Sequence, residues 1–124
     1  MTMKINYEEA IASVREDLRE NAQRAATAVQ TALRALENED AQLARAVIDG
    51  DTAIDLAENA IEEKCLDILA LDGPVATDLR RVVTILKTNA QIERLGDLAT
   101  NIAEDIVYLK TAEIVRHDQP KNAR

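Results

Sequence analysis

The sequence predicts an all-α protein, an antiparallel bundle of three long helices. Apolar residues recur every three or four positions over three long stretches, which is the spacing of one helix face. Only three glycines and two prolines occur among 124 residues, too few for the many turns of an all-β domain. Hydrophobic residues make up 47% and aromatic residues 2%. We therefore expect one domain whose single core is built from Leu, Ile, Val and Ala.

The first two helices are expected at about residues 7–37 and 41–71. Between them, Asn38-Glu39-Asp40 supplies helix-stop and N-cap residues. The apolar stripe of the first helix contains Ile11, Val14, Leu18, Ala22, Ala25, Val29, Leu33 and Leu36. The stripe of the second contains Leu43, Val47, Ile54, Ala57, Ile61, Cys65 and Ile68.

The third helix is expected at about residues 75–112, after a turn at Asp72-Gly73-Pro74. Its apolar stripe contains Val82, Ile85, Ile92, Leu95, Ala99, Ile102, Ile106 and Leu109. From His117 onward the pattern fades. We therefore predict a helical domain at residues 1–116 and a flexible tail at residues 117–124.

Charge and composition exclude several classes of function. The net charge of −8 argues against binding to nucleic acid or to anionic membrane surfaces. No apolar run approaches the ~20 residues of a membrane span, and residues 1–7 lack the apolar region of a signal peptide. Cys65 is the only cysteine, so no intrachain disulfide can form, and we interpret it as a core residue. These features predict a cytoplasmic protein.

Acidic residues border the apolar stripes of the second and third helices. Steps of three and four residues place each set on one helix face. The second helix carries Asp51, Asp55, Glu58 and Glu62, and the third carries Glu93, Asp97, Asn101 and Glu104. If the predicted turn joins an antiparallel pair, position i faces roughly position 145 − i. Asp51 and Asp55 then lie level with Glu93 and Asp97, so four carboxylates converge on one patch.

Three interpretations of the acidic patch compete, because gathered like charges repel unless something neutralises them. One is a solvated face with Lys87 and Arg94 as partners, and the weakest is a general acid/base pair, since no nucleophile accompanies it. Metal binding is favoured. Oxygen ligands without His or Cys favour Mg²⁺, Mn²⁺, Ca²⁺ or iron over structural Zn²⁺. The only His, His117, lies in the predicted tail, which argues against ferritin-type di-iron enzymes with their Glu-x-x-His pairs.

Two glycines stand beside these acids, Gly50 before Asp51 and Gly96 before Asp97. Each costs about 1 kcal/mol relative to Ala inside a helix, so each needs a reason. We weigh two: close packing of the helices, and space beside the acids for ions or a partner.

The third helix resembles the signature stretch of the PhoU family. The matching segments are Pro74-Val-Ala-Thr-Asp-Leu-Arg80, Leu86-Lys87 and Glu93-Arg-Leu-Gly-Asp-Leu-Ala-Thr-Asn-Ile-Ala-Glu104, and the second helix matches from Leu43 to Glu62. The resemblance covers about residues 10–115. It implies an all-α fold that binds metal ions, sometimes as multinuclear iron or zinc clusters. The implied ligands are Asp51, Asp55, Glu93 and Asp97, with Glu58, Glu62, Asn101 and Glu104 as additional metal or partner contacts.

The resemblance also implies a function, that of a negative regulator of the phosphate response and not of an enzyme. Such a regulator couples the high-affinity phosphate ABC transporter, through its ATPase, to a sensor histidine kinase, and these partners would hold it at the inner face of the membrane. The alternatives are a metal-free helical adaptor and, less favoured, a metal-dependent hydrolase.

Two features depart from the family pattern. Most members carry two copies of the three-helix unit, whereas this sequence shows one without an internal repeat, and Gln91 stands where many relatives have an acid. We expect a homodimer to restore the two-unit arrangement. The expected contact is on the first helix, at Ala26, Ala32 and Ala35.

Overall fold

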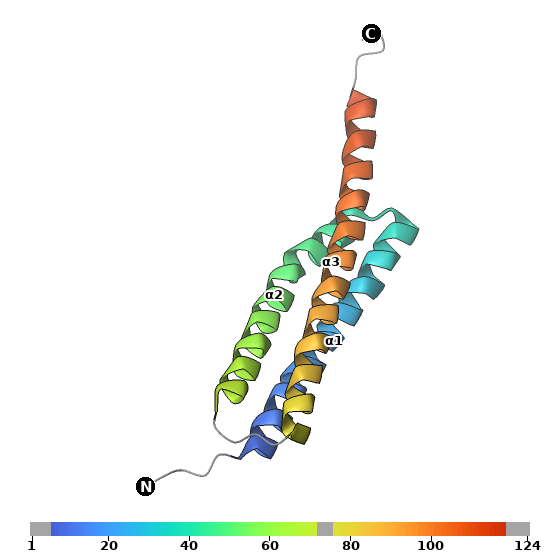
Figure 1. Cartoon of the computed structure of the whole chain (residues 1–124). Coiled ribbons are helices and arrows are strands. Elements are labelled where there is room, and N and C mark those ends of the chain that lie inside the picture. Colours follow the sequence, from blue (N-terminus) through green and yellow to red (C-terminus); the bar gives the residue numbers. More distant parts are fainter. Residues whose placement is uncertain (1–5, 72–75, 119–124) are drawn as a thin grey trace.

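The computed structural model describes residues 6–71 and 76–118, which form three helices packed as an antiparallel bundle (Figure 1). Helix α1 spans Tyr7–Asn38, α2 spans Ala41–Ala70 and α3 spans Ala76–Asp118. The described residues contain no strand, so the predicted fold class is confirmed. The predicted turn at residues 72–74 lies outside the described residues, as do residues 1–5 and 119–124.

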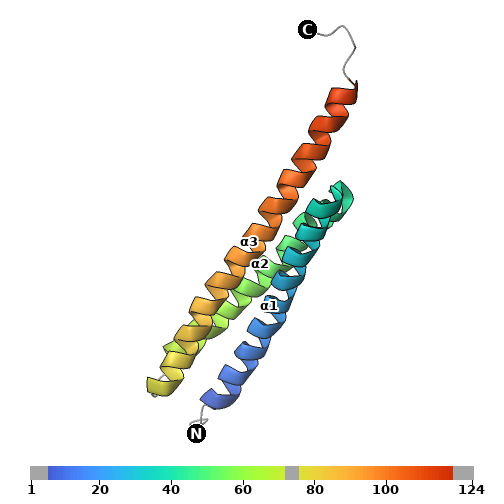
Figure 2. The ribbon, with the colours of Figure 1, turned by 90° about the vertical axis from the view of Figure 1, so that its right-hand side faces the viewer.

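Helix α3 is longer than expected. It continues past residue 112 to Asp118, into the segment predicted as a tail. Figure 2 shows its C-terminal part extending beyond the end of the α1–α2 pair. No helix in the described part of the chain is both long enough and apolar enough to cross a membrane.

Side chains cap the first two helices at their N-termini. Oδ1 of Asn6 accepts a hydrogen bond from the backbone N–H of Glu9 at 3.0 Å, and Oδ1 of Asp40 accepts one from Leu43 at 3.0 Å. Glu39 adopts the left-handed conformation, with φ 48°, and ends α1. The break predicted at residues 38–40 is therefore confirmed.

The core consists of three clusters along the bundle axis. The first, near the start of α1, contains Ile11, Val14, Ile61, Cys65, Ile68, Val82 and Ile85. The central one contains Ala25, Ile54 and Ile92. The third contains Ala32, Ala35, Ala44, Val47, Ala99, Ala103 and Ile106. Small side chains dominate the third cluster, so the helices approach each other closely there. Cys65 is fully buried, as predicted.

The predicted stripe of α1 is wrong at its C-terminal end. Leu33 and Leu36 are 49% and 52% exposed, whereas Ala32 and Ala35 are fully buried. The close approach of the helices leaves room only for alanine at the contact, and the leucines lie one position further round. Since Ala32 and Ala35 are used inside the domain, they are not available for the homodimer contact expected from the sequence.

Two buried asparagines hold α2 against its neighbours. The side chain of Asn21 on α1 donates a hydrogen bond to the carbonyl of Ile54 at 3.1 Å, and Asn89 on α3 donates to the carbonyl of Glu58 at 3.0 Å. The two carbonyls lie one helical turn apart on α2. Both asparagines are almost inaccessible to solvent, so these hydrogen bonds fix the position of the stretch of α2 that carries the acidic residues.

Candidate metal centre

Helices α2 and α3 come closest where Gly96 is buried. A Cβ atom at residue 96 would lie 3.3 Å from Cγ2 of Ile54 and 3.6 Å from Oδ1 of Asp51. A contact of 3.3 Å is tight, so glycine at this position serves close helix packing. Asp51 lies within one turn of the height on α3 that the sequence predicted for it.

Gly50 does not share this role. A Cβ atom there would meet nothing within 4 Å. The residue lines an open groove of about 460 Å³ between α1 and α2, together with Thr27 and Thr31. The expectation that Gly50 makes space beside the acids is wrong, because the residue faces another pair of helices.

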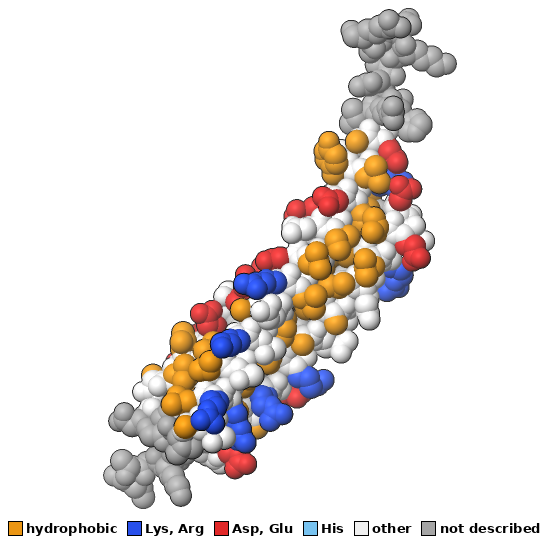
Figure 3. Space-filling view, turned by 45° about the vertical axis from the view of Figure 1, so that its right-hand side comes forward, with side chains coloured by type: hydrophobic (Ala, Val, Ile, Leu, Met, Phe, Trp, Pro, Cys, Tyr) orange, Lys and Arg blue, Asp and Glu red, His pale blue; other side chains and the backbone are white. Residues whose placement is uncertain are grey.

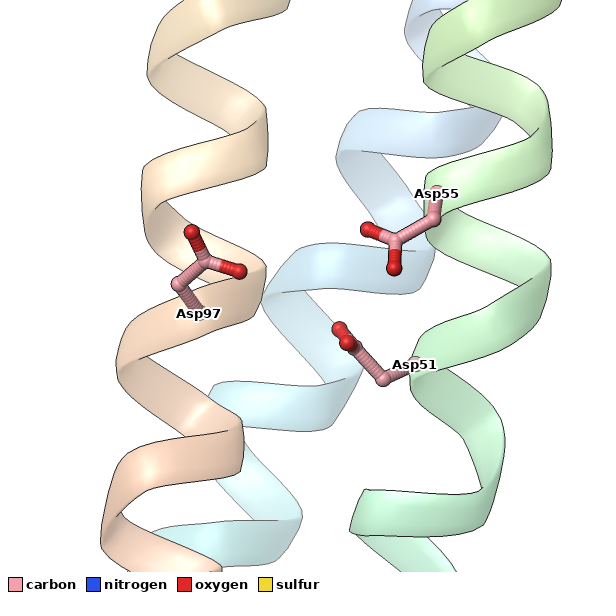
Figure 4. A group of neighbouring side chains, drawn as sticks. All are labelled: Asp51, Asp55 and Asp97. Atoms are coloured by element: carbon pink, nitrogen blue, oxygen red, sulfur yellow. The ribbon is translucent and has the colours of Figure 1, made fainter.

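Three aspartates meet across the seam between α2 and α3. One carboxylate oxygen from each of Asp51, Asp55 and Asp97 lies within 4.8 Å of the others. Figure 4 shows Asp51 and Asp55 pointing from α2 toward α3, and Asp97 approaching from the opposite side. Asp51 is half-buried, whereas Asp55 and Asp97 are exposed. The group is therefore anchored at its base and open to solvent.

Glu93 lies outside this group, although the sequence placed it among the four converging acids. Its charge raises the pKa of Glu58, for which burial is the larger cause, and Glu62 contributes as well. Glu93 and Glu58 thus form a second pair of neighbouring acids beside the three aspartates. Asn101 and Glu104 are exposed farther along α3, and neither belongs to the group of three.

The electrostatics of the group centre on Asp55. Partial burial raises the pKa of its carboxyl, and the negative charges of Asp51, Asp97 and Glu93 raise it further. All of these causes disfavour the ionised form. Without a cation the site is therefore strained electrostatically at neutral pH.

No basic side chain relieves this strain in the described part of the chain. Its ion pairs, Arg19–Glu16, Lys64–Asp17, Arg81–Asp78 and Lys110–Glu113, all lie elsewhere. Arg94 donates instead to Oε1 of Gln91, at 3.5 Å. A face neutralised by Lys87 and Arg94, which the sequence left open, is not what the structure shows.

One atom of the group lacks a partner. Oδ1 of Asp51 is buried and accepts no hydrogen bond. A buried oxygen left without a donor typically costs about 1–3 kcal/mol, so such groups call for an explanation. A cation between Asp51, Asp55 and Asp97 would satisfy this oxygen and neutralise the repulsion together.

The donor set indicates which cations fit. All three ligands are carboxylates, which suit Mg²⁺, Mn²⁺, Ca²⁺ and iron. Cys65 offers no alternative thiolate, because burial raises the pKa of its thiol and the charge of Glu62 adds to the rise. The residues present therefore fit a hard metal ion, with water completing its coordination.

Comparison with known proteins identifies one family along most of the chain. The family model described as the PhoU domain matches residues 18–106. A phosphate-specific transport system accessory protein PhoU of Edwardsiella tarda is 46% identical over 71 residues, which cover 57% of this chain and 29% of that protein. No solved structure matches significantly.

Two longer matches extend over nearly the whole chain. Homolog 1 of the same accessory protein in Thermotoga maritima is 32% identical over 114 residues, covering 92% of this chain and 49% of the relative. The homolog in Caulobacter vibrioides strain NA1000 is 33% identical over 108 residues, covering 87% and 47%. The chain thus spans less than half the length of each of these relatives.

Proposed function

The chain belongs to the PhoU family, and from this premise we propose that it is a metal-binding regulatory domain that controls phosphate uptake. The family model covers residues 18–106. The relatives are named as accessory proteins of a phosphate-specific transport system, which supports a regulator and not an enzyme.

The observation that carries the metal-binding part is the group formed by Asp51, Asp55 and Asp97. Their carboxylate oxygens lie within 4.8 Å of one another, and Oδ1 of Asp51 is buried without a partner. Glu93 and Glu58 stand beside the group and would extend it if more than one ion binds. The metals that we propose are iron, manganese, magnesium or zinc, bound singly or as a multinuclear cluster.

A metal here would supply positive charge, and the protein would do the rest. Asp51 and Asp55 present oxygens from α2, Asp97 presents one from α3, and Asn89 keeps α2 at the required height through the carbonyl of Glu58. Occupancy would therefore tie α2 to α3, and it would change the charge of the surface offered to a partner.

Thermal melts with Mn²⁺, Mg²⁺, Fe³⁺ and Zn²⁺ test this site. At least one metal should raise the midpoint, because a ligand that binds only the folded state stabilises it. The double variant Asp55→Asn/Asp97→Asn should abolish the rise. The site is wrong if no metal moves the midpoint, or if the double variant keeps the full shift.

For the regulatory part we propose a negative modulator that links the phosphate ABC transporter, through its ATPase, to a sensor histidine kinase at the inner face of the membrane. The printed names of the relatives support transport control; the kinase link comes from the family resemblance. Cells lacking the chain should express phosphate-starvation genes in phosphate-rich medium. A reporter that stays repressed in such cells would contradict this role.

A metal-free helical adaptor is the second candidate, and exposed leucines on the bundle surface favour it. Leu33, Leu36 and Leu98 are each about half exposed, as expected of a surface that grips another protein. Elemental analysis of protein purified without chelator separates the two candidates. Absence of bound metal, together with retained regulation in cells, would favour the adaptor.

We also propose that the chain forms a homodimer, although not through the α1 alanines first expected. Pairing would restore the length of the relatives, of which the chain covers 49% or less. Sedimentation equilibrium with metal present tests it. A monomer across the micromolar range would exclude the homodimer.

A further inference from the structure

The groove between α1 and α3 differs in charge from the rest of this acidic protein. It has a volume of about 390 Å³ and contains no carboxylate. Three arginines, three threonines and two apolar residues line it: Arg15, Leu18, Thr77, Arg80, Arg81, Thr84, Ile85 and Thr88. The chain as a whole has 23 acidic and 15 basic residues, so a lining with arginines and no acid is a local concentration of positive charge.

The arginines of this groove have free hydrogen-bonding capacity. Arg15 and Arg80 form no ion pair within the described residues, and Arg81 has only a 4.0 Å contact with Asp78. The hydroxyl of Thr84 donates to the carbonyl of Arg80 at 2.7 Å, and that of Thr88 donates to Thr84 at 2.8 Å. The threonines are thus held against α3, and the guanidinium groups are the available donors.

The same face becomes apolar toward the other end of the bundle. Leu33 follows Arg15 by 18 residues, and Leu98 follows Arg80 by 18 residues; each interval is five turns at 3.6 residues per turn, so each pair points in one direction. Leu36 and Leu95 repeat the directions of Leu18 and Thr77 in the same way. Figure 3 shows basic side chains on the lower part of one face and hydrophobic side chains above them.

We propose that this α1/α3 face, basic at Arg15, Arg80 and Arg81 and apolar at Leu33 and Leu98, docks an amphipathic helical segment of a partner protein. The segment carries acidic side chains at the end that meets the arginines and apolar side chains along the rest. The distance from Arg80 to Leu98 is about 27 Å, at 1.5 Å per residue, so the segment needs roughly 20 residues. The inference rests on the proposed role as a regulator with a protein partner, and it does not depend on metal.

The pattern of the face argues against two other occupants. A second copy related by a two-fold axis would place the arginines opposite either the partner's arginines or its leucines, and never opposite acids. A polyanion without apolar groups would satisfy the arginines and leave the leucines exposed. An acidic amphipathic helix matches both ends, since Arg binds carboxylates through paired donors and half-exposed leucines provide area for burial.

Fluorescence anisotropy with two synthetic helical peptides tests the proposal. Each has about 20 residues with leucines on one face; the acidic probe carries glutamates at one end, and the basic probe carries lysines there. The full chain should bind the acidic probe at least tenfold more tightly than the basic one. The affinity should fall as salt is raised, because salt screens exposed charges.

Two variants locate the contact. Arg15→Glu/Arg80→Glu should weaken binding of the acidic probe at least tenfold, whereas Arg45→Glu, which makes the same kind of charge change on α2, should have little effect. Leu33→Ser/Leu98→Ser should weaken it as well, with Leu56→Ser as the matched control on α2. All replaced side chains are exposed, and thermal melts confirm that each variant is folded.

Several results would overturn the proposal. It is wrong if the acidic probe does not bind, if the two probes bind equally, or if the groove variants bind like their controls. A short inorganic polyphosphate that binds as tightly and displaces the probe would identify a polyanion site instead. A wild-type dimer that Leu33→Ser/Leu98→Ser converts to monomer would show that a second copy covers the face. Metal binding that persists in the groove variants keeps a failure here distinct from a failure of the metal site.

Discussion

Helix α3 separates two surfaces with opposite charge problems. On its α2 flank, Asp51, Asp55 and Asp97 crowd like charges into a narrow seam, and a small cation can resolve their repulsion. On its α1 flank, Arg15 and Arg80 stand unpaired in an open groove that continues into exposed leucines. The comparison teaches that spacing and not charge alone separates the two kinds of site: a tight cluster suits an ion, and an extended amphipathic strip suits a protein.

The largest effect is expected from driving the seam apart. Gly96→Leu places a side chain where even a Cβ atom meets Ile54 at 3.3 Å, so we expect a loss of about 3 kcal/mol in unfolding free energy and loss of the metal-induced stabilisation. Denaturant melts with and without Mn²⁺ measure both effects.

Gly50→Leu is the matched control for this wedge. Its Cβ atom meets nothing within 4 Å, so metal stabilisation should survive. The distinction between the seam and its surroundings breaks down if the two leucine variants lose metal binding equally.

Removing charge from the seam should have the next largest effect. With metal at 100 times its dissociation constant, the wild type should gain about 2.7 kcal/mol, and Asp55→Asn/Asp97→Asn should gain none. Without metal the double variant should be more stable than the wild type, because the repulsion that raises the pKa of Asp55 is gone. A metal-free double variant that is less stable than the wild type would show that the carboxylates do not repel as described.

Alanine at the two glycines gives a finer comparison. Gly50→Ala should stabilise the protein by about 1 kcal/mol, the difference in helix propensity. Gly96→Ala should gain little or nothing, since Ile54 must shift to admit the new methyl group. Equal gains in thermal melts would mean that α2 and α3 are not closely packed at residue 96.

A smaller effect is expected from pH in the metal-free protein. The folded-state pKa of Asp55 and that of Glu58 are both raised, so their contribution to stability is fully present below the unfolded-state pKa and is lost as pH rises through the folded-state pKa. Stability should therefore increase as pH falls from neutral toward that range. The gain is limited by solvent screening, because Asp55 is exposed. In Asp55→Asn the increase should be reduced; an unchanged pH profile would assign it to other groups.

The smallest effect on stability is expected on the other flank. Arg15→Glu/Arg80→Glu should change the unfolding free energy by about 0.5 kcal/mol or less, as exposed substitutions away from the core usually do. A large loss in a denaturant melt would show that the arginines serve the fold, and the groove would then be no docking surface.

Much of this comparison follows from the sequence. Steps of three and four residues predict the helices, Asp40 predicts the break between α1 and α2, and the antiparallel register brings Asp51 and Asp55 level with Asp97. These features depend on local periodicity and on one turn, so no knowledge of the packing is needed to infer them.

The features that the sequence did not reveal depend on how closely the helices pack. Hydrophobicity favours Leu33 and Leu36 as core residues, yet only Ala32 and Ala35 fit the contact. Asn21 and Asn89 escaped notice because they are polar, although Asn89 fills the gap of the apolar stripe between Ile85 and Ile92. The separation of Glu93 from the three aspartates depends on side-chain direction, which helical spacing alone does not determine.

Metal content tests the central claim most directly. The wild-type chain and Asp55→Asn/Asp97→Asn are purified side by side without chelator, dialysed against Mn²⁺ or Fe³⁺, freed of excess ion, and analysed by inductively coupled plasma mass spectrometry. The account predicts at least one retained ion per wild-type chain and only background in the double variant. Background levels in both proteins, or equal retention by both, would contradict a metal centre between α2 and α3.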